Sequence, residues 1–170
     1  PHMQGHAFLG PKSGEPRTYV YAIRDRMAER FDTVRVVRDK QFQYLRNFQP
    51  HRSWSQFTSY TEEMPTMKVW RAMAEAGQLN AVQARYFQPN KPVEELYDTQ
   101  ADPHQVNNLA DDPSYSKVLD RMRRECRDWM LRTHDLGLLS EYELEQRSAG
   151  RTPWDIAHDA RANPLDPLLA

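Results

Sequence analysis

The sequence predicts an α+β fold, in which a small antiparallel sheet of about four strands is packed by one long C-terminal helix, with irregular insertions between the elements. Three observations lead to this prediction. Short β-branched and aromatic runs recur in the first hundred residues, a turn of three residues separates two of them, and an amphipathic helix begins near residue 113. The length of 170 residues corresponds to one domain that can bury a hydrophobic core.

The strand signals share their composition, which is rich in Val, Ile, Tyr, Phe and Thr. They lie at residues 18–23, 33–38, 42–48 and 94–98. Only residues 39–41 separate the second strand from the third, which is the length of a hairpin turn, so these two strands should pair antiparallel.

The long helix is expected at about 113–136. Asp112 suits its N-cap, Pro113 suits its first position, and Gly137 suits its C-terminal end. Its apolar residues form one stripe of a helix with 3.6 residues per turn: Tyr115, Val118, Leu119, Met122, Cys126, Trp129 and Met130. This stripe predicts a helix that packs across the sheet, with Cys126 as a buried residue and not as a nucleophile.

The remaining segments are less regular. Two short helices are expected at about 66–76 and 80–87, and an irregular loop is expected at 50–65. Residues 148–170 contain three prolines and predict an extended tail, with helix at most over 153–161. Five apolar residues of the loop and the tail should cover another domain or a second copy of the chain, which could form an oligomer: Trp54, Trp154, Leu165, Leu168 and Leu169.

Composition and charge exclude several classes of protein. The chain has 23 basic and 24 acidic residues and no basic block, which argues against a nucleic-acid partner. No apolar run is long enough for a membrane span. A single cysteine excludes an intrachain disulfide and a cysteine-based zinc site. The compartment stays open, although the lack of an Asn-x-Ser/Thr sequon favours a bacterial periplasmic or secreted protein.

The residues do not assemble a catalytic or metal site. The histidines are far apart and form no spaced ligand pair, no serine lies in a strained turn, and the glycine-rich phosphate loop is absent. We therefore expect no catalytic residue and no metal ligand in this chain.

The segment 24–30 is the best candidate for binding because five of its seven residues are ionisable and it follows a strand. One interpretation is a salt-bridge cluster on the surface whose members pair with each other. The other is a site for an anion, because guanidinium groups bind sulfate, phosphate and carboxylate with two hydrogen bonds. In the second case, Arg24 and Arg26 face the same side, and Asp25 faces Arg30 or Arg35 as a structural partner. The candidate substrate-binding residues are Arg24, Asp25, Arg26 and Glu29.

The region after the fourth strand carries a resemblance to a known family. It reads Glu95-Leu96-Tyr97-Asp98, then Asp102-Pro103-His104, then Asn108-Leu109-Ala110, and the long helix follows. By itself this tract predicts a compound turn whose side chains bind the backbone. Its order closely resembles the C-terminal subdomain of type I, formylglycine-dependent sulfatases of the alkaline phosphatase superfamily. The likeness covers about 4–147 and is greatest to heparan N-sulfatases (sulfamidases) through Trp129 and 133–135.

The resemblance implies that the parent protein hydrolyses sulfate esters or N-sulfates of a sulfated sugar. It implies a catalytic N-terminal domain, outside this chain, with the formylglycine and a calcium ion, because Cys126 is not in a Cys/Ser-x-Pro-x-Arg motif. This part would complete the fold, shape the substrate pocket and be inactive alone. Two alternatives are a non-catalytic accessory module and the C-terminal part of a phosphonate or phosphate monoester hydrolase.

The expected division of the chain follows from the same resemblance. Residues 1–3 are a remnant of cloning, 4–16 a linker from the catalytic domain, 17–147 the sulfatase subdomain, and 148–170 the extended tail.

Overall fold

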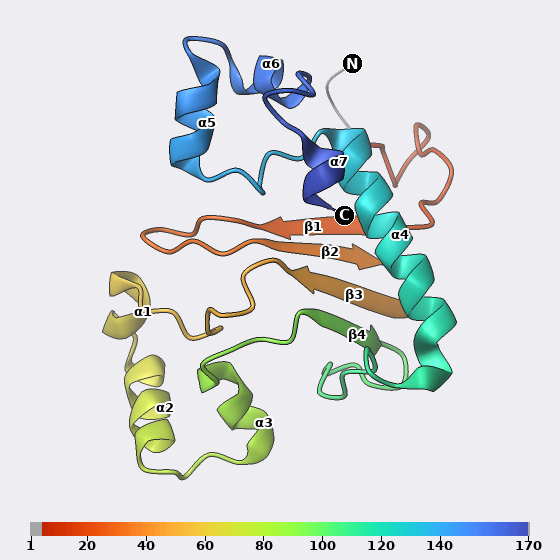
Figure 1. Cartoon of the computed structure of the whole chain (residues 1–170). Helices are drawn as coiled ribbons and strands as arrows, with labels where there is room; N and C mark the ends of the chain where they lie inside the picture. Colours follow the sequence, from red (N-terminus) through yellow and green to blue (C-terminus); the bar gives the residue numbers. More distant parts are fainter. Residues whose placement is uncertain (1–4, 170) are drawn as a thin grey trace.

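The computed structural model describes residues 5–169 and confirms the α+β fold with four antiparallel strands (Figure 1). The expected cloning remnant at 1–3 and the first residue of the linker lie outside the described residues. The strands lie side by side in chain order: β1 (Val20–Arg24), β2 (Val34–Arg38), β3 (Phe42–Asn47) and β4 (Glu94–Asp98).

The strand register divides the sheet into two faces. Tyr21, Val37, Tyr44 and Leu96 are directly opposite one another across the four strands, and the next row consists of Ala22, Val36, Leu45 and Glu95. Because successive side chains of a strand point to opposite faces, these two rows belong to opposite faces. We call the face of the Tyr21–Leu96 row the covered face and the face of the Ala22–Glu95 row the open face.

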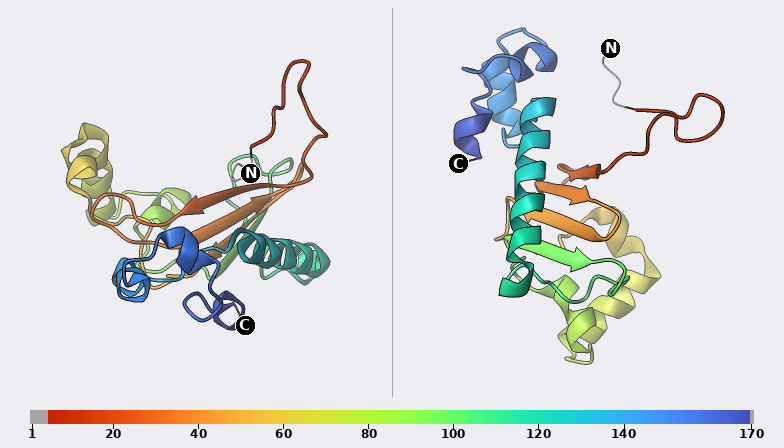
Figure 2. Two further views of the ribbon diagram at one scale, coloured as in Figure 1. Left: turned by 90° about the horizontal axis from the view of Figure 1, so that it is seen from above. Right: turned by 90° about the vertical axis from the view of Figure 1, so that its right-hand side faces the viewer.

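The covered face packs against the long helix α4 (Ser116–Thr133), which the short 3-10 turn η2 (Pro113–Tyr115) precedes. Figure 2 shows α4 against one side of the sheet, while the N-terminal segment extends from the other. The buried core that they form consists of Val37, Tyr44, Leu96, Leu119, Met122, Cys126, Met130 and Leu165. Cys126 is 3% exposed, as expected of a core residue, and its burial raises the pKa of the thiol to about 12.

The ends of α4 confirm one expectation and correct another. Asp112 accepts a hydrogen bond from the backbone N–H of Ser114 and is the expected cap. The prediction that Gly137 ends the helix is wrong, because His134 is the C-cap in the left-handed conformation, with φ of 53°. Its N–H donates to the carbonyls of Met130 and Leu131, which completes the last turn three residues early.

The insertion between β3 and β4 carries four short helices at the end of the sheet away from α4 (Figure 1): α1 (Ser59–Glu63), α2 (Pro65–Glu75), α3 (Ala81–Ala84) and η1 (Arg85–Phe87). The loop expected at 50–65 therefore contains a helix, which begins where Thr58 accepts a hydrogen bond from the N–H of Thr61. Trp70 of α2 stacks on Tyr86 with the ring centroids 4.7 Å apart, so the insertion has a small aromatic core of its own.

The C-terminal region contains three further helices: α5 (Glu141–Ser148), α6 (Pro153–Ala157) and α7 (Leu165–Leu168). The expectation that Leu165 and Leu169 cover another domain or copy is wrong. Leu165 is 6% exposed in the core beside α4, and Leu169 packs against that core, because the chain folds back after α6. Trp154 and Leu168 remain exposed, and Trp54 is half-buried.

The outer edge of β4 is covered by the segment that follows it. The side-chain oxygen of Asn108 accepts from the N–H of Leu96, and its amide N–H donates to the carbonyl of Glu94. The backbone N–H of Leu109 also donates to the carbonyl of Leu96 at 2.8 Å. The expected compound turn is confirmed in these contacts. Within residues 5–169, no helix is both long and apolar enough to span a membrane.

Candidate functional site

The charged segment 24–30 forms a tight turn at the end of β1. The backbone groups of Met27 and Arg30 exchange two hydrogen bonds, of 2.8 and 3.0 Å, and Ala28 has a positive φ of 49°. No ion pair joins two charged side chains within 24–30 in the described part of the chain; the ion pairs of this segment run to other segments. The contacts therefore differ from those of a self-paired surface cluster.

Asp25 is held by a buried guanidinium, as expected for one of its two candidate partners. Arg35 of β2 is fully buried, and its Nη1 donates to Asp25 Oδ1 at 2.8 Å. The Nε and Nη2 of Arg35 donate to the two oxygens of Asp135, at 2.5 and 2.8 Å. Burial alone would lower the pKa of Arg35, but hydrogen bonds to Asp135 and Asp25 outweigh it and raise the pKa. This pairing fixes the backbone of the charged turn against the C-terminal end of α4.

Gly137 is required by this ion pair and not by the end of a helix. A Cβ atom at Gly137 would lie 1.7 Å from Arg35 Nη2 and 2.8 Å from Asp25 Oδ1. Since a side chain cannot fit there, the backbone of Gly137 closes over the guanidinium. Sequence reasoning missed Asp135 and Gly137 as partners because they lie about a hundred residues from Arg35.

Arg24 points to a second charged group, on the open face. Its Nη1 lies 3.9 Å from Asp32 Oδ2, and the same oxygen binds the Nζ of the buried Lys91. Lys91 Nζ lies 4.5 Å and the Arg24 guanidinium 5.8 Å from the centre of the Trp54 ring. We call Asp32, Trp54 and Lys91 the Trp54–Lys91 group. Burial lowers the pKa of Lys91, and the hydrogen bond to Asp32 opposes this. The buried Nε of Arg24 has no hydrogen-bond partner among the described residues.

Arg26 and Glu29 lie on the exposed side of the turn. Arg26 Nη1 donates to Glu141 Oε2 of α5 at 2.9 Å, and both side chains are about half exposed, at 51% and 57%. Glu29 accepts a hydrogen bond from the backbone N–H of Ser59 at 2.7 Å, which lowers the pKa of its carboxyl. The expectation that Arg24 and Arg26 face the same side is therefore wrong. Arg24 faces the Trp54–Lys91 group, and Arg26 faces α5, because the chain turns after β1 instead of continuing as an extended strand.

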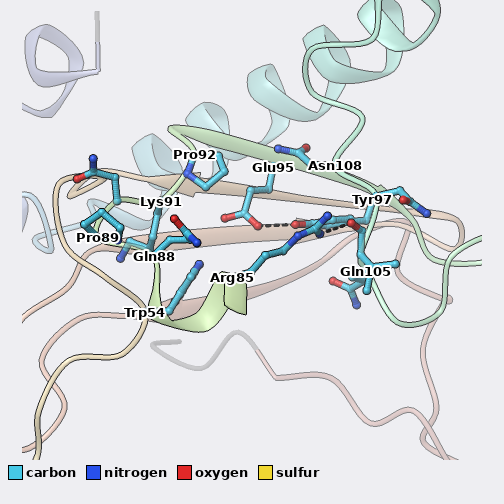
Figure 3. Close-up of a pocket in the computed structure, with 13 residues that line it drawn as sticks. Trp54, Arg85, Gln88, Pro89, Lys91, Pro92, Glu95, Tyr97, Gln105 and Asn108 are labelled. Carbon is cyan, nitrogen blue, oxygen red and sulfur yellow. Dashed lines mark hydrogen bonds between the residues drawn. The ribbon is translucent and has the colours of Figure 1, made fainter. Parts of the chain in front are cut away.

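A pocket of about 850 Å³ adjoins the Trp54–Lys91 group on the open face of β4 (Figure 3). Its lining combines an aromatic ring, charged groups and amides: Trp54, Arg85, Gln88, Pro89, Asn90, Lys91, Pro92, Glu95, Tyr97, Gln105, Val106, Asn107 and Asn108. Glu95 lies at its floor and accepts from Asn47 Nδ2 at 2.7 Å and from the hydroxyl of Tyr97 at 2.6 Å. This pocket could not be predicted from the sequence, because its walls come from three separate segments.

The chemistry that these residues support is binding. Within the described range no three His, Cys, Asp or Glu side chains gather where they could hold a metal ion. Cys126 is buried with a raised pKa. The charged turn and the pocket instead offer guanidinium groups, amides and one indole ring, which suit a polar, anionic ligand.

The comparisons with known proteins agree with the resemblance found in the sequence. No family model matches the chain. An ulvan-active sulfatase from Formosa agariphila is 38% identical over 143 residues, which are 84% of this chain and 24% of that protein. N-sulphoglucosamine sulphohydrolase from Homo sapiens is 44% identical over 41 residues, which are 24% of this chain and 8% of that protein.

A solved structure of a 2-O GAG sulfatase matches 73% of this chain and 18% of its own, with 22% identity and a TM-score of 0.44. The chain thus spans about a quarter of the length of the ulvan-active sulfatases that it matches, which is 24% for one and 26% for the other.

Proposed function

Because this chain is homologous to sulfatases over most of its length, we propose that it is the C-terminal subdomain of a formylglycine-dependent sulfatase. The observation that carries the proposal is the 38% identity over 143 residues to an ulvan-active sulfatase. In this proposal a longer parent protein supplies the formylglycine and the calcium ion from an N-terminal domain. Residues 4–16 link to that domain, 17–147 form the subdomain, and 148–170 form the C-terminal tail.

The proposed substrate is a sulfated sugar. The matched relatives are named for activity on ulvan and on N-sulphoglucosamine, and both names indicate sulfated carbohydrate. The proposed role of this subdomain is to complete the fold and to shape the substrate pocket with the charged turn at 24–30. Asp25 would keep the turn in place through Arg35, and Arg24, Arg26 and Glu29 would contact parts of the substrate away from the sulfur.

The first test is expression of the longer protein from the gene, with the region upstream of this chain included. We expect desulfation of a sulfated oligosaccharide by the longer protein, and no calcium-dependent turnover of an aryl sulfate by this chain alone. A longer protein that prefers phosphate or phosphonate monoesters would assign the chain to the related hydrolases. A longer protein without a hydrolase domain would leave a non-catalytic accessory module.

The second test concerns Arg26 in the longer protein. Loss of a charge-assisted contact costs about 1.5–3 kcal/mol, so Arg26→Ala should lower kcat/KM for the sulfated sugar roughly ten- to a hundredfold, mainly through KM. A small aryl sulfate should be hydrolysed almost as before. Glu141→Ala is the matched control, because it breaks the same ion pair and leaves the guanidinium in place. Equal losses in the two variants would mean that Arg26 acts only on the structure.

A further inference from the structure

The pocket beside β4 is separate from the residues that the proposed function uses. The pocket adjoins the charged turn only at Trp54 and Lys91, which line it. The Arg24 guanidinium lies over the Trp54 ring. At about 850 Å³ it is large enough for a sugar unit of an oligosaccharide.

Of the two cations that line the pocket, Arg85 is the one that has hydrogen-bond donors available for a ligand. It is exposed, at the start of η1, and its Nη1 donates to the carbonyl of Val106. Its Nε and Nη2 have no hydrogen-bond partner among residues 5–169, and it forms no ion pair in that range. Figure 3 shows its side chain lying along the pocket toward Tyr97. A guanidinium with free donors on one side can bind an anion with two hydrogen bonds.

The other charges of the pocket are already satisfied. Both oxygens of Glu95 accept hydrogen bonds from Asn47 and Tyr97, and burial followed by the bond to Glu95 raises the pKa of Tyr97, so its hydroxyl keeps the proton that it donates. Lys91 is buried against Asp32. The pocket lining holds two cations, Arg85 and Lys91, and one carboxylate, Glu95, an excess of one positive charge.

The remaining walls fit a sugar better than a lipid or a flat aromatic ligand. Gln88 and Asn90 are exposed side-chain amides, which can both donate to and accept from sugar hydroxyls. Trp54 is half-buried, so its ring presents a rigid apolar wall beside these polar groups.

We propose that this pocket binds an anionic sugar unit of the substrate chain, and that Arg85 is the residue that holds its acidic group. This proposal rests on the proposed function in one respect: the sugar unit is taken to belong to the sulfated polysaccharide or oligosaccharide that the parent protein acts on. The acidic group is either a carboxylate or a sulfate, since both accept two hydrogen bonds from a guanidinium.

The test is an NMR titration of the 170-residue chain, labelled with ¹⁵N, with three sugars: glucuronic acid, galactose 6-sulfate and galactose. We expect the first or the second to shift the Arg85 Nε–H and the Trp54 indole N–H with increasing concentration, and galactose to bind at least about tenfold more weakly. Arg85→Gln should weaken the binding of the acidic sugar about tenfold or more, and Arg85→Lys should weaken it less. Arg38→Gln is the matched control, because Arg38 is exposed on the same sheet and lies outside the pocket.

Three results would overturn the proposal: no shift at the pocket with either acidic sugar, equal binding of galactose, or unchanged binding by Arg85→Gln with an unchanged fold in its spectrum. The longer protein separates this proposal from the proposed function. If it has sulfatase activity and Arg85→Gln leaves its KM for an acidic oligosaccharide unchanged, the pocket proposal fails alone. If the pocket binds acidic sugars and the longer protein has no sulfatase activity, only the proposed function fails.

Discussion

The two faces of the sheet are built from different chemistry. The covered face presents Tyr21, Val37, Tyr44 and Leu96 to α4, and three of these are buried in the core. The open face presents Ala22, which is exposed, Val36 and Leu45, which are half-buried, and the carboxylate of Glu95 at the floor of a pocket. The covered face follows the rule that apolar side chains are buried together. The open face instead buries polar groups, most of which have hydrogen-bond partners, although Arg24 Nε and Asn47 Oδ1 have none among the described residues.

This difference assigns stability to one face of the sheet and ligand binding to the other. Packing against α4 provides the hydrophobic core, so residues of the covered face should dominate the free energy of unfolding. Residues of the open face should matter more for ligands. Arg35 is an exception that tests this division, since it lies on the covered side and is charged.

The largest expected effect is that of Arg35→Met. It removes a buried cation and leaves Asp25 and Asp135 close together without it, and breaking a buried pair in this way costs about 3–5 kcal/mol. Chemical denaturation of the variant and the parent chain measures this. Arg38→Met on the same strand is the control and should change stability by less than about 0.5 kcal/mol. If the two variants are equally stable, the ion pair makes no net contribution.

The next effect compares the two faces directly. Leu96→Ala removes a fully buried side chain from the covered face and should cost about 3 kcal/mol. Leu45→Ala removes a half-buried side chain from the open face on the neighbouring strand and should cost about 1 kcal/mol. Thermal and urea denaturation of both variants give the difference. Equal costs would show that the open face is packed as tightly as the covered face.

Gly137→Ala should destabilise the chain by about 1–3 kcal/mol, as overpacking does. The added methyl group would meet the Arg35 guanidinium, which cannot move without leaving Asp135. Gly14→Ala is the control and should change stability little, because nothing lies within 4 Å of a Cβ added at Gly14. A stable Gly137→Ala variant would mean that the chain after α4 can shift away from β2.

The smallest expected effect is a loss of stability at acidic pH that results from protonation of Glu94, a residue beside α4. The side-chain hydrogen bond from Arg123 is the main cause of its lowered pKa, and the hydroxyl of Tyr44 adds to it. A carboxyl with a lowered folded pKa contributes stability above its unfolded value of about 4.5, and the contribution disappears as the pH falls through the folded pKa. We expect about 1 kcal/mol to be lost below pH 4.5. Glu94→Gln should remove this part of the pH dependence of the free energy of unfolding, measured by denaturation at several pH values. If the variant loses as much stability below pH 4.5 as the parent chain, this expectation is wrong.

Local patterns predicted most of the regular structure. The strand at 94–98 agrees with β4, and the apolar stripe predicted the face that α4 buries. The end of α4 was misplaced because glycine is the usual signal for a helix end, whereas Gly137 serves the distant Arg35. Helix α5 was missed although Ser140 and Glu143 form a capping box, which is a sequence-level signal for a helix start.

The candidate site was predictable only in part. The density of charge marked residues 24–30, and Arg35 was one of two partners expected for Asp25. Asp32, Lys91 and Trp54 could not be connected to Arg24 from the sequence, because the folding of the insertion brings them together. A pocket formed by three segments has no local pattern at all.

The two outer edges of the sheet differ in a way that bears on the solubility of the chain. Along β4, Asn108 and Leu109 occupy hydrogen-bonding groups that another strand would use, so this edge cannot template the addition of a second molecule. Along β1 no further strand of the described chain is paired, and Val20 and Ile23 are 51% and 61% exposed. Edge-to-edge aggregation of this chain would therefore begin at β1, while the Asn-Leu-Ala tract protects the other side.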